Sequence, residues 1–517
     1  MRFVLYAFAC CIASSVSAAD GHVETFPSPA GLAPAPDFRV EVNGEAQFVY
    51  DTPVEPFVSF AFSGQVTVRI ITLPDAQLGA AHRYTVWRKT IRAQPLRGDI
   101  RELVIRPRLA GIDGKIDGGT IAFVLDKPCR LSIEINGNLT RPLFLFADAV
   151  NPDLPKPGDT NVRTFAAGKV HDAGQIQLQD NETIYIPGGA VVRGMIHGEG
   201  VHNARVLGQG ILDGSDPDKV KSPLIAFREC RDILVDGPVV LNEHGWTIVP
   251  RQSERVTFRN IKLIGWSNNS DGIDISGCRD VTVDGCFLRN NDDCIPIKAN
   301  RGNENHDVDG VRVLRSVFWN ATGGNAIEIG FELRTKSIRN VLWRDCDIIH
   351  VEDGAAFSIH NGDWATVENI RFEDIRVEDA CDELIDLSVG LSIYSDDCPS
   401  EYARSNSKRK PIPDALRAQP GTNNQSVWLR LPKEEMDARA MNRGQIKNIH
   451  FKNIHVLADC TPSSIIQGYD ESRPVSGVTI EGLHMGNRPI LSADEGRFRI
   501  ERAENIRFLG TEAVVSD

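Results

Sequence analysis

A short strand motif recurs along the C-terminal two thirds of the chain at intervals too long for hairpins. Apolar triplets that read as short strands begin at Ile233, Val256, Val281, Val311, Val341, Ile370, Ile449 and Val478. The first five steps are 23, 25, 30, 30 and 29 residues. Each step suits one coil of a solenoid, in which a coil buries its inward side chains by stacking on its neighbours. A β-sandwich, the alternative, would show hairpin turns every ~8–12 residues. The spacing therefore predicts an all-β chain that contains a parallel β-helix.

The first 150 residues lack that period. Alternating segments such as Phe38–Val42 and Val66–Ile70 are typical of half-buried antiparallel strands. The stretch Asn151–Gly158 is rich in turn-forming residues, which is typical of a linker. We therefore predict a β-sandwich domain over residues 20–150 and a β-helix domain over residues 151–517. The stretch Asp396–Gly444 interrupts the coil spacing and predicts a long excursion packed against the helix.

The N-terminus has the features of a secretory signal over residues 1–19. Arg2 precedes an apolar run over residues 3–12, and Val16-Ser17-Ala18 forms a small-residue cleavage site. We expect a secreted or periplasmic protein, the alternative being a buried N-terminal helix. No later apolar run is long enough to span a membrane.

Charge and cysteine content limit the partners. The net charge is −13, and without a basic stripe the chain is not expected to bind nucleic acid. The cysteines show no metal-ligand spacing, so we expect neither a metal ion nor a cofactor. Cys381 and Cys398 are the best candidates for a disulfide in an oxidising compartment. Cys286 and Cys346 are expected to be buried thiols, because two coil spacings separate them.

Two aspartate-rich turns occupy neighbouring coils of the predicted helix. Aligning Ile273-Asp274-Ile275 with Ile295-Pro296-Ile297, a shift of 22 residues, places Asp271 and Asp293 in one column, with Asp292 one residue away. Adjacent coils stack ~4.8 Å apart, so the three carboxyl groups should lie close together. Extended to both sides, this register predicts the column His244, Asp271, Asp293, Asn325 and Ala355.

Three neighbouring carboxylates repel one another, which raises at least one pKa and can keep one acid protonated near neutrality. Glycoside hydrolysis needs that division between a protonated and an ionised carboxyl group. The aspartate cluster by itself also allows two other interpretations. Clustered carboxylates also bind calcium, and ladders of Asn and Asp also cap turns without any chemistry.

The motifs of this region resemble those of the polygalacturonases, glycoside hydrolase family 28. The resemblance rests, in order and in spacing, on Gly245–Pro250, Val256–Ile261, Asn269–Asp274 and Asn291–Cys294. It implies a right-handed parallel β-helix and an inverting hydrolase. Asp292 would be the general acid, while Asp271 and Asp293 would hold the attacking water. An inverting enzyme is expected to separate acid and base carboxyl groups by ~6.5–9.5 Å.

The chain departs from that family where the family binds the substrate carboxylate. G-H-G is replaced by Gly324-Asn325-Ala326, and R-I-K by Ser358-Ile359-His360. Arg and Lys together are the natural clamp for a carboxylate, so we expect a sugar other than galacturonate at the cleaved bond. The sandwich ahead of the helix and the run Trp266–Ile273 resemble the dextranase family, which implies a neutral α-glucan as an alternative substrate.

Five further side chains are candidate substrate contacts, either in the acid column or outward-facing on the same sheet: His244, Lys298, Asn325, Glu328 and His360. For His244 a structural corner histidine is an equally good interpretation, and for the outward-facing residues a solvated strand face is the alternative. Trp246 is expected in the core.

The function expected from these features is hydrolysis of a polysaccharide or oligosaccharide. A β-helical polysaccharide lyase is an alternative, but such lyases use a bound cation and a basic proton abstractor, and Lys298 is the single basic residue near the acids. A non-catalytic carbohydrate-binding protein would have no reason to hold three mutually repelling carboxylates.

Overall fold

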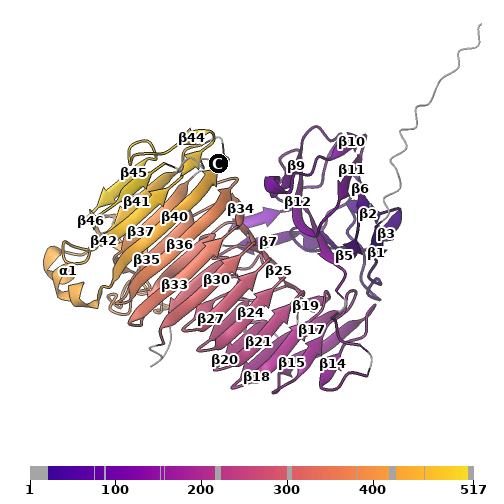
Figure 1. Cartoon of the computed structure of the whole chain (residues 1–517), viewed down its shortest axis with the longest axis horizontal. Coiled ribbons are helices and arrows are strands. Elements are labelled where there is room, and N and C mark those ends of the chain that lie inside the picture. The colour runs from indigo at the N-terminus through magenta and orange to yellow at the C-terminus, as the bar shows by residue number, and fades with distance from the viewer. Residues whose placement is uncertain are drawn as a thin grey trace, which may run out of the picture.

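The computed structural model describes residues 21–510, except residues 75, 87–88, 152, 157, 216–222, 300–305, 381, 418–426 and 459. It has two parts, a compact pair of sheets near the N-terminus and a long stack of parallel strands (Figure 1). The predicted signal, residues 1–19, lies outside the described residues. No helix among the described residues is long and apolar enough to cross a membrane.

The N-terminal part is the predicted β-sandwich. One sheet contains β1 (His22–Glu24), β4 (Val49–Tyr50), β5 (Phe57–Ser63), β9 (Leu103–Arg106), β12 (Cys129–Ile135) and β13 (Leu143–Ala149). The other contains β2 (Phe38–Val42), β3 (Glu45–Gln47), β6 (Val66–Thr72), β10 (Lys115–Asp117) and β11 (Thr120–Leu125). Alternate residues of both sheets, such as Val40, Phe60 and Ile121, meet in one apolar core. A separate hairpin, β7 (Arg83–Val86) and β8 (Lys89–Arg92), extends from this part.

The rest of the chain is a parallel β-helix with three faces. The cleft face contains β15 (Val170–Gln177), β17 (Val191–Glu199), β20 (Ile225–Arg228), β23 (Ile248–Arg251), β26 (Ile275–Ser276), β29 (Ile295–Ala299), β32 (Ile327–Leu333), β35 (Ala355–Asn361), β37 (Glu383–Val389), β41 (Ser463–Gln467) and β45 (Phe498–Glu501). The sandwich-facing side contains β19 (Ile211–Asp213), β22 (Val239–Leu241), β25 (Lys262–Ile264), β28 (Phe287–Asn290), β31 (Val317–Asn320) and β34 (Asp347–Val351).

The third face carries the repeat that the sequence revealed. Its strands are β14 (Val162–Thr164), β16 (Thr183–Tyr185), β18 (His202–Leu207), β21 (Arg231–Asp236), β24 (Glu254–Arg259), β27 (Arg279–Asp284), β30 (Val308–Leu314), β33 (Ser337–Arg344), β36 (Thr366–Val377), β40 (Gln445–Val456), β42 (Val475–Glu481) and β47 (Arg507–Leu509). The predicted triplets pair in one row, from Ile233 with Val256 through to Ile449 with Val478. The predicted register of this face is confirmed.

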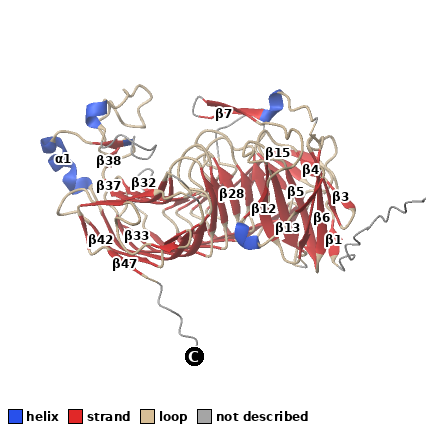
Figure 2. Ribbon diagram, turned by 90° about the horizontal axis from the view of Figure 1, so that it is seen from above, coloured by secondary structure: helices blue, strands red, loops and turns tan. Residues whose placement is uncertain are grey.

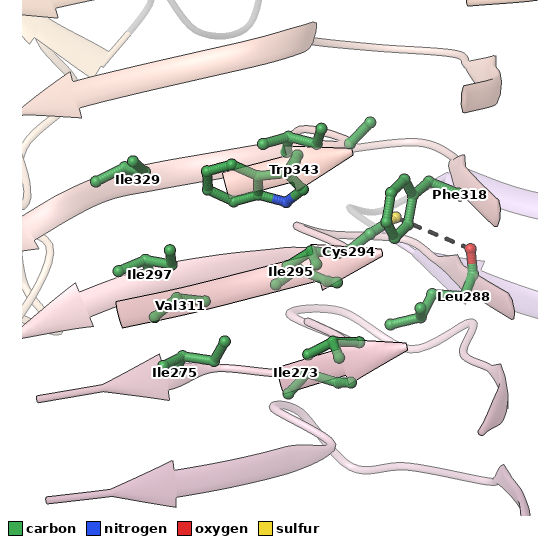
Figure 3. Packing of buried hydrophobic residues seen from close by; sticks show 14 of the residues in the cluster. Ile273, Ile275, Leu288, Cys294, Ile295, Ile297, Val311, Phe318, Ile329 and Trp343 are labelled. Atoms are coloured by element: carbon green, nitrogen blue, oxygen red, sulfur yellow. Dashed lines mark hydrogen bonds between the residues drawn. The ribbon is translucent and has the colours of Figure 1, made fainter. Parts of the chain in front are cut away.

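Stacked aliphatic side chains fill the interior of the helix. Ile273 and Ile275 lie below Ile295 and Ile297 of the next coil, and Ile329 follows (Figure 3). All five are fully buried, so each coil depends on its neighbours for the hydrophobic stabilisation of its inward residues. This ladder fixes the register in which the outward residues meet.

The sandwich packs against the side of the helix through aromatic rings. Phe144 contacts Phe287 with a centroid distance of 4.9 Å and Trp319 with one of 5.9 Å. All three side chains are buried, and buried ion pairs accompany them, such as Arg289 Nε with Glu55 Oε1 at 2.9 Å. Large apolar interfaces of this kind hold two parts of a chain in a fixed relation.

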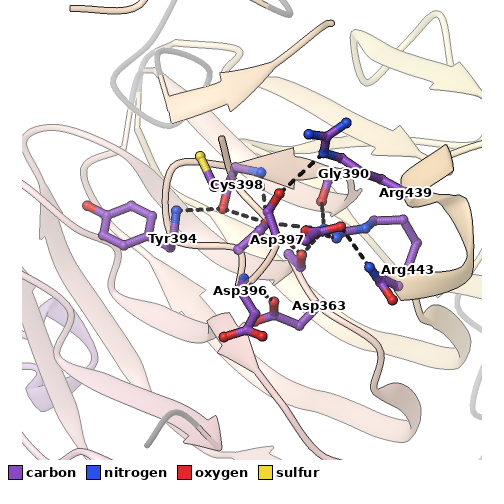
Figure 4. A network of polar contacts seen from close by, with 12 residues as sticks. Asp363, Gly390, Tyr394, Asp396, Asp397, Cys398, Arg439 and Arg443 are labelled. Atoms are coloured by element: carbon purple, nitrogen blue, oxygen red, sulfur yellow. Dashed lines mark hydrogen bonds and ion pairs between the residues drawn. The ribbon is translucent and has the colours of Figure 1, made fainter. Parts of the chain in front are cut away.

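The predicted excursion from the coils lies between β37 and β40. It contains β38 (Leu391–Ser392), β39 (Trp428–Leu429) and α1 (Lys433–Arg439). Its base is held by Arg443, which pairs with Asp397, and by the backbone N–H of Asp396, which donates to Asp363 Oδ1 over 2.8 Å (Figure 4). The excursion therefore stands in a defined position over the cleft face.

One cysteine prediction is confirmed and one is wrong. Cys286 and Cys346 are buried free thiols, as expected. Cys398 is also a free thiol, so it does not pair with Cys381, which itself lies outside the described residues. Cys398 packs instead with Leu391 and Leu429 in the apolar cluster of the excursion, whereas Cys460 is disulfide-bonded.

Candidate active site

The predicted column of polar residues is present from Asp271 onward. Ile275 pairs with Ile297, and Ile297 pairs with Ile329, which aligns Asp271 with Asp293 and Asp293 with Asn325. The backbone agrees, because the N–H of Gly272 donates to the carbonyl of Asp293 over 2.9 Å. The two aspartates thus lie on adjacent coils at the strand spacing.

The column differs from the prediction at its first member. Ile248 pairs with Ile273, a shift of 25 residues, so that Trp246 rather than His244 precedes Asp271 in the column. Trp246 is half-buried and borders the cleft, and its expected place in the core is wrong. His244 is hydrogen-bonded through Nε2 to the carbonyl of Gly214 at 2.8 Å. A shift of two residues preserves which side chains face inward, so alternation could not detect it.

A cleft of about 1010 Å³ lies over these residues. Its floor contains Asp271, Asp292 and Asp293. One wall is the excursion, and the other is the β7 hairpin of the sandwich; the two project from the same side of the molecule (Figure 2). A concave site with convergent polar groups is where a ligand is expected to bind.

The three aspartates form one cluster around an ammonium group. An oxygen of each of Asp271, Asp292 and Asp293 lies within 4.8 Å of the other two. Lys298 Nζ is 3.1 Å from Asp271 Oδ2 and 3.8 Å from Asp293 Oδ2. The expected carboxyl separation of ~6.5–9.5 Å is therefore wrong, because residues of adjacent coils are held at the strand spacing.

Asp274 is a fourth carboxyl group that the sequence analysis did not single out. It is fully buried, its Oδ1 lies 3.7 Å from Lys298 Nζ, and neither oxygen accepts a hydrogen bond within the described part of the chain. The alternation of Ile273, Asp274 and Ile275 already places it on the outward side of the strand, which is the signal that could have identified it.

Burial and mutual repulsion raise the pKa values of the carboxyl groups in this cluster. The pKa of Asp271 rises to about 8, mainly because burial disfavours its charged form, and the charge of Asp292 adds to the rise. Burial likewise raises the pKa values of Asp274, Asp292 and Asp293. Lys298 opposes this rise for all four groups. The cluster can therefore hold both protonated and ionised acids near neutral pH.

Asn325 orients one of the catalytic candidates. Its backbone N–H donates to Asp293 Oδ1 over 2.8 Å, and its Nδ2 donates to the same oxygen over 3.2 Å. Nδ2 also lies 3.0 Å from Glu328 Oε2. Asn325 borders the cleft, but these bonds give it first of all the task of fixing the Asp293 carboxyl group.

Glu328 and His360 point outward from the sheet, as predicted, but are not accessible. Both are fully buried, and His360 lies between two acids, with Nδ1 3.0 Å from Glu328 and Nε2 3.1 Å from Asp386. Phe331 stacks on the His360 ring at 4.4 Å, and Trp428 of the excursion lies 5.7 Å away. The expected contact of these two residues with substrate is therefore wrong, because the excursion covers them.

Arg289 was missed by the sequence analysis, and it links the sandwich to the turn that carries Asp292. Its Nε donates to Glu55 over 2.9 Å, and its Nη1 donates to Asn291 Oδ1 over 3.0 Å. Asn291 directly precedes Asp292. A buried guanidinium with such directed bonds holds the turn in place, and no local pattern in the sequence reveals that its partner lies in the other domain.

The aspartate triad also has the size of a cation site, because three carboxylate oxygens converge. Lys298 Nζ, however, already lies within 3.1–3.8 Å of two of the three acids. An ammonium group there supplies the positive charge that a metal ion would bring. The donor set therefore suits proton transfer better than cation binding.

Replacing His360 by Ala should lower the free energy of unfolding by about 3–5 kcal/mol, because it removes the cation between two buried carboxylates. Burial lowers the pKa of His360, but the charges of Glu328 and Asp386 raise it well above its usual value, so the histidine is protonated. Urea denaturation measures the loss, with the exposed His202→Ala as the control. A change below about 1 kcal/mol in His360→Ala would contradict this role.

The sequence of the helix matches a known family. Residues 153–404 match the model of the glycosyl hydrolases family 28. Polygalacturonase QRT2 of Arabidopsis thaliana is 24% identical over 206 residues, which cover 36% of this chain and 45% of that protein. Probable endo-xylogalacturonan hydrolase A of Aspergillus fumigatus is 26% identical over 211 residues, which cover 35% and 48%. The chain thus spans about half the length of the curated relatives that it matches.

The two-part architecture also has a counterpart among solved structures. Dex49A from Penicillium minioluteum superposes with a TM-score of 0.54 and 14% identity, over 93% of this chain and 96% of that one. That likeness concerns the fold, and it confirms the predicted right-handed β-helix preceded by a β-sandwich. Over residues 153–404 the chain is thus similar to glycosyl hydrolases family 28.

Proposed function

We propose that this protein is an inverting glycoside hydrolase that cleaves a polysaccharide in the cleft over Asp271, Asp292 and Asp293. The observation that carries the proposal is the unequal contact of these acids with Lys298. Its ammonium group pairs with Asp271 and Asp293, whereas none of the described cations lies within ion-pair distance of Asp292. The three acids are thus divided into two that contact the ammonium group, which favours their charged forms, and one that does not.

This division matches the roles that hydrolysis requires. Asp292 is the most accessible of the three acids, so it can reach the oxygen of the leaving group. Asp271 Oδ1 is buried without a hydrogen-bond partner in the described structure, and it can accept a hydrogen bond from a water held between Asp271 and Asp293. A proton donor and an ionised base are the two groups that glycoside hydrolysis needs.

The reaction then proceeds in one displacement. The water oxygen attacks the anomeric carbon while the glycosidic C–O bond breaks. Asp292 gives its proton to the departing oxygen, and the proton lost by the water passes to Asp271 or Asp293. Lys298 stabilises the ionised base before the reaction, because an ammonium at 3.1 Å favours the charged form of Asp271.

The carboxyl spacing by itself would favour retention, since ~5–5.5 Å is the spacing of retaining enzymes. Two observations support inversion here. The order of Asn269–Gly272 and Asp292-Asp293 is that of family 28, and Asp293 is held by two hydrogen bonds from Asn325, which fix it as a water ligand rather than leave it free to form a bond to the sugar.

A lyase reaction is the alternative that the buried lysine disfavours. Such a reaction needs a basic side chain free to abstract a proton. Lys298 is 5% exposed and paired with acids, and the neighbouring charges raise its pKa well above its usual value although burial opposes them. It therefore stays protonated and cannot act as the abstracting base.

A neutral sugar suits the cleaved position better than a uronate. The two positions at which the family carries its cationic clamp hold Ser358 and His360, both buried away from the cleft. The cleft is lined by seven carboxyl groups and four cationic side chains, so its charge disfavours an anionic sugar. The signal-like N-terminus supports a secreted or periplasmic location, where a polysaccharide would be met.

Asp292→Asn should abolish hydrolysis, to below a few per cent of the wild-type rate, because the amide keeps the shape but has no proton to give. Reducing-sugar release on a polysaccharide panel measures this loss. Asp414→Asn, at a side chain that is 99% exposed, is the matched control.

With the wild type, proton NMR of the products in the first minutes should show the inverted anomer, and a retained anomer would refute the inverting mechanism.

Lys298→Met should move the acid limb of the kcat profile to higher pH. Lys298 lowers the pKa of Asp271, which stands at about 8 in its presence. Without the ammonium group that pKa rises further, so the base becomes ionised only at higher pH. Lys298→Arg keeps the charge and should leave the limb near its wild-type position. A limb that is unmoved or moves to lower pH in Lys298→Met would contradict the assigned role.

The wild-type protein should release little or no galacturonic acid from polygalacturonate and should cleave a neutral polysaccharide, with α-linked glucans the first to test. A charged sugar at the cleaved bond would lose hydration without the Arg and Lys pair that would offset this loss. Chromatography of the products after equal incubations compares the two substrates. Abundant galacturonic acid would overturn the specificity while leaving the role of Asp292 intact.

A further inference from the structure

The β-sandwich supplies part of the wall of the catalytic cleft. Val86 and Lys89, at the paired ends of β7 and β8, border the same cleft as Asp271 and Asp292, which lie about two hundred positions later in the chain. Figure 2 shows this hairpin raised above the body of the molecule, on the side from which the excursion also rises. The cleft therefore runs between one arm from each part of the chain.

The hairpin is held in a fixed position relative to the catalytic turn. Tyr84 in β7 contacts Arg289, with 3.3 Å between Tyr84 Oη and Arg289 Nη2. Arg289 in turn donates to Asn291 Oδ1 over 3.0 Å, next to Asp292. A buried guanidinium held by several directed hydrogen bonds has little freedom to move. The distance between the hairpin and the acids is therefore fixed before a substrate binds.

Of the two described hairpin residues that border the cleft, Lys89 is the exposed one. It is exposed, and none of the described acidic side chains forms an ion pair with it, whereas Val86 beside it is fully buried and anchors the strand end. A lysine ammonium has three donors and a long flexible stem. At the edge of a cleft it can reach the hydroxyl oxygens of a bound sugar.

We propose that the β7–β8 hairpin forms a binding subsite for a sugar unit next to the cleaved bond, with Lys89 as the residue that donates hydrogen bonds to its hydroxyl groups. This inference rests on the proposed function. The cleft volume of about 1010 Å³ is at the upper end of the ~300–1,000 Å³ that encloses a drug-sized ligand. The cleft thus has room for sugar units beyond the one that is attacked.

The opposite wall has the chemistry that complements such a unit. Tyr394 of the excursion borders the cleft and stacks on Phe331 with a centroid distance of 5.1 Å. An aromatic ring supported from behind offers a rigid apolar surface for the face of a sugar ring. A hydrogen-bond donor on one arm and an aromatic surface on the other fit a single neutral, hydroxyl-rich chain passing between them.

The test is Lys89→Ala on a polysaccharide that the wild type cleaves. A lost charged hydrogen bond made in both the ground state and the transition state should raise KM about tenfold and leave kcat within about twofold. Lys115→Ala, at an exposed position of β10 in the same sandwich, is the matched control and should leave KM unchanged. The thermal midpoint of both variants should equal that of the wild type.

Binding without turnover gives an independent measurement. In an Asp292→Asn background, calorimetry with an oligosaccharide of the cleaved polymer should show about tenfold weaker affinity when Lys89 is also replaced. Equal KM and equal affinity in Lys89→Ala and Lys115→Ala would overturn the subsite. Absence of hydrolysis by the wild type on every glycan would instead overturn the proposed function, so the two failures are distinguishable.

Discussion

The stacking of one coil on the next is the constraint on which this molecule depends. The inward ladder of Ile273, Ile295 and their neighbours leaves no register other than the one that buries them. With that register set, Asp271 and Asp293 must face each other across one strand spacing. The site is therefore a consequence of core packing, since the same hydrogen-bonded ladder that stabilises the coils brings two acids together.

Such a concentration of acids requires compensation, and a single lysine provides it. Four carboxyl groups lie around Lys298, and three of them are within 3.1–3.8 Å of its nitrogen. The Trp246 ring covers the same ammonium at a centroid distance of 4.5 Å, a favourable contact for a partly desolvated cation. Removing such a lysine would leave charged acids that must take up protons, which links the stability of the site to its protonation.

The sequence predicted the features that depend on local periodicity and missed those that depend on distant segments. Alternation and coil spacing were sufficient to align Asp271 with Asp293. They could not distinguish Trp246 from His244, because both choices keep the same faces inward. They also could not reveal that the excursion covers His360 with Trp428, because a strand pattern does not show which loop residue, here one 68 residues later, will pack against the strand.

The docking of the sandwich onto the helix also depends on the burial of apolar side chains. On the side of the helix formed by β28 and β31, Phe287 and Trp319 point away from the helix core. Phe144 of the sandwich covers these two apolar side chains, which would otherwise face water. Because β28 leads directly into the turn that carries Asp292, the surface that binds the sandwich and this turn follow each other along the chain. Arg289 lies on that strand and bonds to both sides. A change in how the sandwich docks would therefore reach the acids through Arg289, which makes the N-terminal part a component of the candidate active site.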